Sequence, residues 1–393
     1  MPIAILPLLI GALIAVTEMS TDMLTAWLPV IGNAFEISEH QTSLIFSINF
    51  LALATAALLY GPLSDHYGRR RMVIVGFSIY CVSSVLCGFV NSFPNLIALR
   101  FLQGLGGGAS FVVGMATIRD RFQGVESARR TSQVEMIMGI SPGLAPIVAS
   151  ATMGFSTWRT AFWLLGLLGF IGFMVIWRFY PETNLVINRQ NFSFRNLFSG
   201  YAHLLTRPKY LGFGIINVLT IAWLWGEYAT IPFIFIEALH VPTGDFGYFL
   251  CLNVLAFFIG TIVNQVMVRR LGINRLMITG IIIVLVDILL LTLMQAFLPL
   301  NPYLLALMKA PAQFGAALTT SNAMTRALEN AGHESGSGAA MITCGQLLVG
   351  ALYINQSTHY YDGTLWPLIA CMVVSSSLAF LTYIGLRIFY PQH

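Results

Sequence analysis

Two acidic residues lie four positions apart in a segment that carries no other charge. The segment from Thr17 to Trp27 reads TEMSTDMLTAW, and its two carboxyl groups belong to Glu18 and Asp22. Residues four apart share one face of an α-helix. A carboxylate at the middle of a bilayer costs roughly 2.5–3.5 kcal/mol on insertion scales, and a second one adds repulsion. This cost falls when one of the two holds a proton, so the pair could bind and release protons.

Two other interpretations of this pair stay open. Either acid could accept a structural hydrogen bond from a neighbouring helix, or it could lie at an exposed position near the outer membrane surface. Acidic residues within membrane spans are functional-site candidates by default. We therefore predict that Asp22 and Glu18 take part in proton coupling.

Polar residues also interrupt apolar stretches in the second half of the chain. Glu227 lies in WLWGEYATIP, where it shares a helical face with Trp223 and adjoins Tyr228. We predict that these three residues bind substrate, with Glu227 attracting positive charge. Asn253 and Gln346 could donate hydrogen bonds to a ligand. A glutamate that reaches the outer interface, and amides that only join helices, explain the same pattern.

Three isolated charges need partners within the apolar stretches. Arg100 requires an anion or carbonyl oxygens, and Asp287 stands alone in IVLVDILLLT. Lys309 is a candidate packing partner for Asp287. The seven histidines are scattered, and the five cysteines show no metal or redox spacing. We therefore expect no metal site and no cofactor.

The composition requires a membrane environment for this chain. Of its 393 residues, 57% are hydrophobic and 9% are charged, with a mean hydropathy of +0.77. A soluble globular chain carries about 25% charged residues, whereas long apolar runs are typical of helices that span a bilayer. Twelve such blocks lie near residues 4–29, 41–63, 72–91, 94–117, 131–153, 158–180, 209–236, 246–267, 272–296, 302–325, 336–357 and 364–389.

The longest polar stretch, 181–209, falls between the sixth and seventh blocks. It divides the chain almost in half. We predict an all-α integral membrane protein with an N-terminal six-helix half at 1–180, a cytoplasmic linker at 181–208 and a C-terminal six-helix half at 209–393.

The basic residues predict the orientation of the spans. Seventeen of the 20 Lys and Arg residues fall in the loops on one side or at the end of the last block on that side, and the opposite loops hold none. Basic loops stay in the cytoplasm, so both termini are expected there. The net charge of +4 then reflects topology and is no argument for nucleic acid. The first block lacks the basic start and the cleavage site of a removable signal peptide.

An internal repeat relates the two halves. The turn GPLSDHYGRRRMVI, Gly61–Ile74, matches RRLGINRLMI, Arg269–Ile278, so that Gly68 and Gly272 superpose at an offset of 204 residues. The match indicates two six-helix halves in parallel orientation, an arrangement known from secondary transporters.

The first of these turns has the composition of a structured loop. Its two glycines permit a tight turn, its aspartate can sit against the positive N-terminal end of a helix, and its arginines can pair with Asp120 or Glu126. A basic turn that only sets topology is the alternative for the arginines alone. The residues predicted to form this gating loop are Gly61, Asp65, Gly68, Arg69 and Arg70.

Four stretches of the first half resemble motifs of the major facilitator superfamily. Gly61–Arg71 resembles the signature of its loop 2–3, with His66 in place of the usual basic residue. Leu99–Gly108 resembles the fourth-span motif, and STWRTAF the start of span six. GISPGLAP is similar to the fifth-span antiporter motif in the form of the bicyclomycin-resistance (Bcr/CflA) type. Its marked residues are Gly139, Pro142 and Pro146.

The opening stretch and the second half are similar to the same subfamily. TDM followed by LP in Thr21–Pro29 resembles its first span, although Leu24–Ala26 departs from it. PFIFIEALHV, LNVLAFFIG and SNAMTRALENAG are similar to its spans seven, eight and ten. The resemblance implies the major facilitator fold, with a cavity between the halves that opens alternately to either side. It also makes Arg100 the first candidate partner for Asp22.

The resemblance implies a proton-coupled antiporter that exports lipophilic cationic or zwitterionic small molecules, as in drug efflux. An importer or facilitator of a siderophore or nutrient on the same fold is the alternative. An enzyme would need a nucleophile or a metal cluster, and none is visible in the sequence. A channel would need a continuous polar pore, whereas the polar residues here are few and isolated. We therefore expect neither an enzyme nor a channel. The expected partners are a small-molecule substrate, protons and the lipid bilayer, with the proton gradient as energy source. We expect a monomer in the inner membrane of a bacterium.

Overall fold

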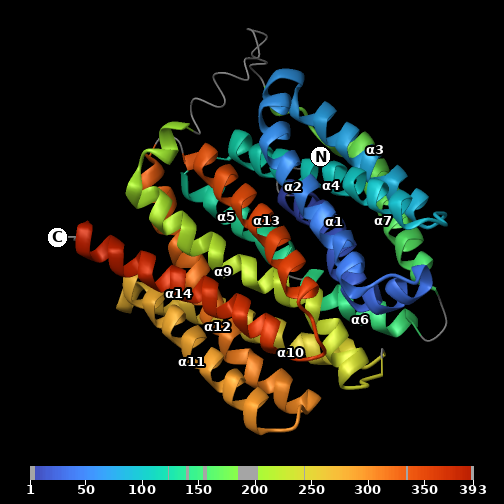
Figure 1. The fold of residues 1–393 in the computed structure, drawn as a ribbon. Helices are drawn as coiled ribbons and strands as arrows, with labels where there is room; N and C mark the ends of the chain where they lie inside the picture. The colour runs from blue at the N-terminus through green and yellow to red at the C-terminus, as the bar shows by residue number, and fades with distance from the viewer. Residues whose placement is uncertain are drawn as a thin grey trace. The chain divides into compact units, whose positions relative to one another are not determined.

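The computed structural model describes residues 5–122, 124–138, 141–153, 157–184, 202–242, 244–332 and 335–390. Throughout these residues the regular structure is helical (Figure 1). The chain divides into two compact units, residues 1–193 and 194–393. Most of the predicted linker, 185–201, lies outside the described residues.

The N-terminal unit is built from seven described helices. They are α1 (Leu6–Phe35), α2 (Glu39–Tyr67), α3 (Arg69–Cys87), α4 (Phe93–Arg121), α5 (Gly124–Met138), α6 (Ser141–Met153) and α7 (Trp158–Phe179). Helix α4 packs against α2 and α3, while α1 packs against α5 and α6. Together α5 and α6 cover the fifth predicted block and begin before it, at Gly124.

After a short helical stretch at residues 202–205, the C-terminal unit contains six longer α-helices and one π-helical turn. They are α9 (Pro208–Pro232), the π-helix η2 (Phe233–Ala238), α10 (Phe246–Leu271), α11 (Ile273–Phe297), α12 (Pro302–Ala331), α13 (Ser335–His359) and α14 (Trp366–Phe389). Helix α9 packs against α12, α13 and α14, and α12 also packs against α10 and α11. Helix α12 also contacts α13, so it touches four of the other helices of this unit.

Local signals in the sequence set where several helices begin. At α2, the Ser38 hydroxyl accepts from the Gln41 amide at 3.3 Å, and the Gln41 side chain accepts from the Ser38 amide at 3.2 Å. This capping box satisfies two amides that have no partner within the helix. At α12, the Asn301 side chain caps the first turn, and Pro302 follows at a position where a missing N–H costs nothing.

Ten of the described helical segments are long and apolar enough to cross a membrane, with α9 and η2 counted together. Of the twelve predicted blocks, the tenth corresponds to α12, which is 30 residues long and more polar. The fifth block is shared between α5 and α6. In a bilayer every backbone amide must find its hydrogen bond within the protein, which is why apolar blocks of this length form helices.

The predicted repeat is visible in the backbone at two turns. Gly68 (φ 95°, ψ 146°) joins α2 to α3, and Gly272 (φ 82°, ψ 156°) joins α10 to α11. The amide of each glycine donates to the carbonyl four residues earlier, at 3.1 and 3.0 Å. Only glycine adopts this backbone conformation without strain. The offset of 204 residues thus relates two turns of the same geometry.

Gly61 differs from its predicted role in such a turn. It lies inside α2, and a Cβ atom at this position would have no neighbour within 4 Å. The helix continues through Gly61 because nothing there demands a left-handed backbone. The turn therefore depends on Gly68 alone.

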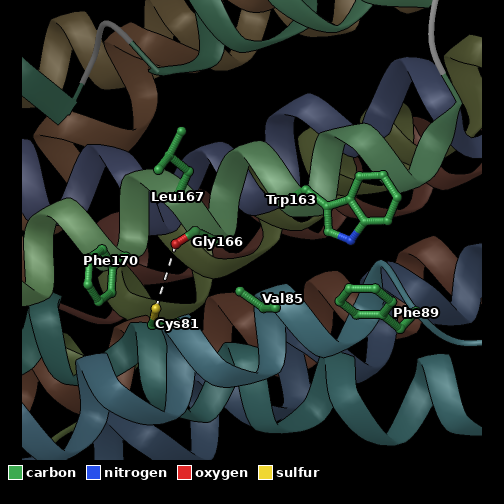
Figure 2. Close-up of a pocket in the computed structure, with 7 residues that line it drawn as sticks. All are labelled: Cys81, Val85, Phe89, Trp163, Gly166, Leu167 and Phe170. Carbon is green, nitrogen blue, oxygen red and sulfur yellow. Dashed lines mark hydrogen bonds between the residues drawn. The ribbon is translucent and has the colours of Figure 1, made fainter.

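An apolar groove lies between α3 and α7 of the N-terminal unit (Figure 2). Phe89, Trp163 and Leu167 line it and are 64, 43 and 56% exposed. The Cys81 thiol, also at the groove, donates to the Gly166 carbonyl at 3.6 Å. No charged side chain lines this groove, and apolar side chains of this kind suit a surface that faces lipid.

Candidate functional site

Asp22 lies near the middle of α1 and is 8% exposed. Its Oδ2 atom accepts a hydrogen bond of 2.8 Å from the Ser141 hydroxyl, at the start of α6. Glu18 lies one turn earlier and is half-buried. No ion pair joins either carboxylate to a cation within the described ranges. Of the predicted pair, Asp22 thus has a neutral hydrogen-bond donor, the Ser141 hydroxyl.

Ser141 belongs to the fifth-span motif but was not predicted as a site residue. It is the only hydroxyl in GISPGLAP, which is the signal that could have identified it. Gly139 lies outside the described residues, as do the side chains of Pro142 and Pro146. The roles predicted for those three residues stay predictions.

Arg100 is fully buried in α4 and is solvated mainly by carbonyl oxygens. Its Nη1 atom donates to the Ser20 carbonyl at 3.1 Å and to the Gln103 side chain, and Nε donates to the Ile45 carbonyl at 3.4 Å. Its Nη2 atom has no partner among the described residues. The expected ion pair with Asp22 is absent from the described part of the chain. The guanidinium donates to backbone carbonyl oxygens of α1 and α2 instead.

Asn49 of α2 connects this arginine to the helix that carries Asp22. The Thr21 hydroxyl donates to Asn49 Oδ1 at 3.1 Å, and Asn49 Nδ2 donates to the Arg100 carbonyl at 3.1 Å. Gly104 allows this approach, because a Cβ there would lie 2.7 Å from the Asn49 side chain. The residue next to Asp22 is thereby held to two other helices.

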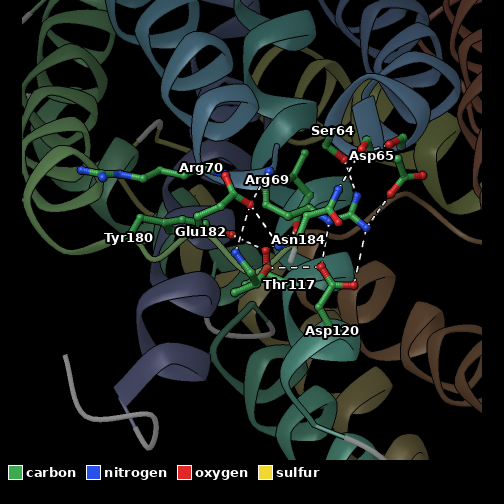
Figure 3. A network of polar contacts seen from close by, with 12 residues as sticks. Ser64, Asp65, Arg69, Arg70, Thr117, Asp120, Tyr180, Glu182 and Asn184 are labelled. Carbon is green, nitrogen blue, oxygen red and sulfur yellow. Dashed lines mark hydrogen bonds and ion pairs between the residues drawn. The ribbon is translucent and has the colours of Figure 1, made fainter. Parts of the chain in front are cut away.

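Arg69, the first residue of α3, is the centre of a polar network (Figure 3). Its Nε atom lies 2.9 Å from Asp120 Oδ2 and its Nη2 atom 2.6 Å from Asp65 Oδ1. Its Nη1 atom donates to the Ser64 hydroxyl. The predicted pairing of the loop arginines with Asp120 is confirmed. The other candidate, Glu126, pairs within its own helix.

Glu182, which follows α7, completes this network and was not predicted. Its carboxylate accepts from the backbone amides of Arg69 at 2.9 Å and of Arg70 at 3.1 Å. These amides begin α3, so the carboxylate lies at the positive end of that helix. Asn184 in the same segment donates to the Asp65 carbonyl at 2.8 Å. The segment after α7 thus ties the α2–α3 turn to the end of α4.

Glu227 of α9 is buried inside the C-terminal unit. Its Oε1 atom lies 2.6 Å from Lys309 Nζ of α12, and both side chains are almost fully buried. Gln313, one turn along α12, donates from Nε2 to both carboxylate oxygens at 3.2 Å. Lys309, a candidate packing partner for Asp287 of α11, forms its ion pair with Glu227 and also acts electrostatically on Asp287.

Of the two amides predicted to bind substrate, Gln346 joins helices and Asn253 bonds within its own helix. Gln346 of α13 donates to Asn217 Oδ1 of α9 at 2.6 Å, and Asn217 donates to a carbonyl of α12 at 2.9 Å. Asn253 is buried and donates to a carbonyl of its own helix at 3.3 Å. Trp223 is buried, while Tyr228 packs against another tryptophan, Trp225, at 5.9 Å between ring centroids. A role of these residues in substrate binding stays a prediction.

Solved structures share this fold. A crystal structure of a D-xylose–proton symporter superposes with a TM-score of 0.73, over 96% of this chain and 97% of that chain, at 14% sequence identity. The chain therefore shares the fold of that symporter. The family model for the Major Facilitator Superfamily matches residues 8–353. The chain belongs to the major facilitator superfamily.

Two curated relatives indicate which members it resembles. A "Bicyclomycin resistance protein homolog" of Haemophilus influenzae is 24% identical over 94% of this chain and 93% of the relative. The "Multidrug transporter MdfA" of Yersinia pestis is 32% identical over 48% of this chain and 46% of the relative. The resemblance to the bicyclomycin-resistance type of drug:proton antiporters, drawn above from motifs, agrees with both.

Proposed function

We propose that the protein is a proton-coupled antiporter that exports lipophilic cationic or zwitterionic small molecules by alternating access across a bacterial inner membrane. The observation that carries this proposal is the burial of the Asp22 carboxyl group. This group lies near the middle of a 30-residue apolar helix, with Ser141 as its hydrogen-bond donor. Because charge at that depth is costly, either a proton or a cationic substrate would stabilise the group.

Competition between these two ligands is sufficient to couple their fluxes. A proton on Asp22 removes the charge that attracts the substrate, and a bound substrate cation displaces the proton. Glu18 lies one turn away and adds to the negative potential that both ligands feel. The proton gradient then drives export without a cofactor. The names of the relatives, which refer to bicyclomycin resistance and multidrug transport, support a drug-like substrate.

The test is proton release when substrate is added to detergent-purified protein in weak buffer, with tetraphenylphosphonium as a lipophilic cationic probe. By linkage, substrate must displace protons to the same extent that protons weaken its binding. We expect wild type to release protons, with weaker probe binding at lower pH. Asp22→Asn should release none and should show pH-independent binding. Glu18→Gln should reduce the release or shift its pH midpoint.

Two results would contradict the proposal. Wild type that releases no proton, or Asp22→Asn that releases as many as wild type, would place the coupling elsewhere. Flux into proteoliposomes under an imposed pH gradient separates export by antiport from the import alternative. Antiport requires probe to move against the proton flux, whereas a symporter would move it in the same direction.

A further inference from the structure

The buried charges of the C-terminal unit do not balance. Glu227 and Lys309 form an ion pair at 2.6 Å, with side chains 4 and 2% exposed. Asp287 of α11 is 1% exposed, and neither of its carboxylate oxygens has a hydrogen-bond partner among the described residues. With all three groups ionised, the cluster would carry one negative charge with no compensating partner.

Asp287 lies deep within its span. It is ten residues before the end of α11 at Phe297, which corresponds to about 15 Å at 1.5 Å per residue. That distance is about half the thickness of the hydrocarbon core of a bilayer. An ionised carboxylate at this depth without a hydrogen bond is far more costly than a neutral carboxyl group. The surroundings therefore favour a proton on Asp287.

The charges that act on Asp287 come from α12 and α9. Lys309 of α12 attracts its carboxylate and Glu227 of α9 repels it. Helices α10 and α14 also pack on α11, but no charged group from either acts on Asp287 among the described residues. One ammonium group thus serves two carboxyl groups.

Gln313 makes an exchange of partners feasible. It lies four residues after Lys309, on the same face of α12. Its amide donates to both oxygens of Glu227. If the ammonium left Glu227, that carboxylate would keep two hydrogen bonds inside the protein. A buried carboxylate that retains donors is much less costly than one without them.

We propose that Asp287, Lys309 and Glu227 form a second proton-binding site, within the C-terminal unit and distinct from Asp22. While Lys309 is paired with Glu227, Asp287 holds the proton. When the O–H bond of Asp287 breaks, the proton passes to water and the Lys309 ammonium, which keeps its three protons, moves to the Asp287 carboxylate. The site extends the proposed antiport to a second proton, but its existence is independent of that function.

Infrared difference spectroscopy of purified protein between pH 5 and pH 9 tests the site directly. A protonated carboxyl group in an apolar site gives a C=O stretching band that shifts in D₂O. We expect wild type to show such a band above the pH at which exposed carboxyl groups have ionised. Asp287→Asn should lose one component of it. The matched control Asp245→Asn, at an exposed position of the same unit, should leave the band unchanged.

A double variant tests the role of the Lys309 ammonium group. Glu227→Gln combined with Lys309→Met removes the ion pair without leaving a lone buried charge. No ammonium group is then left to pair with the ionised Asp287 carboxylate. Asp287 should therefore keep its proton, and its band should persist over the whole pH range. Titration of the band as in wild type would overturn the partner exchange, and a band unaffected by Asp287→Asn would overturn the site.

The outcomes also separate this inference from the proposed antiport. Asp22→Asn should remove a different component of the band and leave that of Asp287. Loss of substrate-linked proton release with an intact Asp287 band would bear on Asp22 alone. Asn matches the neutral carboxyl group in shape, so Asp287→Asn is expected to fold. If it does not accumulate, Asp287→Glu must shift the frequency and the midpoint of the band, and an unshifted band would overturn the site.

Discussion

Alanine at Gly68 should destabilise the protein more than alanine at the matching Gly272. Both glycines have positive φ, 95° and 82°, so each substitution strains the backbone by about 1–3 kcal/mol. At Gly272 the added Cβ would meet nothing within 4 Å, whereas at Gly68 it would lie 2.6 Å from Glu182 Oε2. The Gly68 variant must therefore also displace a carboxylate.

The extra cost follows from what that carboxylate does. Glu182 accepts hydrogen bonds from the amides of Arg69 and Arg70 at 2.9 and 3.1 Å. A hydrogen bond to a charged group contributes about 1.5–3 kcal/mol, and the lower end applies here because Glu182 is exposed. Displacement that weakens one or both bonds adds roughly 1–3 kcal/mol. At about 2–4 °C per kcal/mol for units of this size, the extra loss in Tm is roughly 2–12 °C.

The assay is the apparent Tm of detergent-purified protein, from the fraction that stays monodisperse after heating. All variants are compared at one heating rate, since membrane proteins commonly unfold irreversibly. The control is the Glu182→Ala background, in which Gly68→Ala and Gly272→Ala should cost the same. Equal losses in the wild-type background, or an excess loss at Gly68 that survives without Glu182, would refute the reasoning.

Two further predictions concern the N-terminal unit. Ser141→Ala removes the hydroxyl that donates to the charged form of Asp22, so the proton should be held more tightly and the pH midpoint of probe binding should rise, by roughly half to one unit; a constant or lower midpoint would count against this contact. Asp65→Asn should slow transport several-fold, because Arg69 loses one of its two carboxylate partners. Probe affinity should change little, because Arg69 keeps its other partner, Asp120. Unchanged flux at normal protein levels would contradict that role, and Asp120→Asn, at the less exposed of the two carboxylates, should lower the apparent Tm more.

The sequence alone determined the elements and their repeat. Apolar blocks must form helices in a bilayer because water is absent and backbone groups have no other partners. Gly68 and Gly272 were matched at an offset of 204 residues, and both turns have the same geometry. These features are local, and hydropathy and backbone sterics act over a few residues. The depth of Asp22 and Asp287 in their spans was likewise readable from their apolar neighbours.

Helical periodicity also showed which residues share a face, as for Glu18 and Asp22. It could not show which other helix lies against that face. Arg100 was expected beside Asp22, but the structure gives it carbonyl oxygens of α1 and α2. Many arrangements of apolar helices satisfy the same pattern, so the partner of a buried charge cannot be derived from periodicity alone.

Only the tertiary structure decided the pairs that carry the proposals. Ser141 and Asp22 are 119 residues apart, and Lys309 forms its ion pair with Glu227, a residue for which the sequence offered no partner. Each pair joins two helices whose packing depends on all their side chains together. The physical reason is that a buried charge selects its partner by distance and hydrogen-bond geometry after the helices have packed, and neither quantity is encoded within one span.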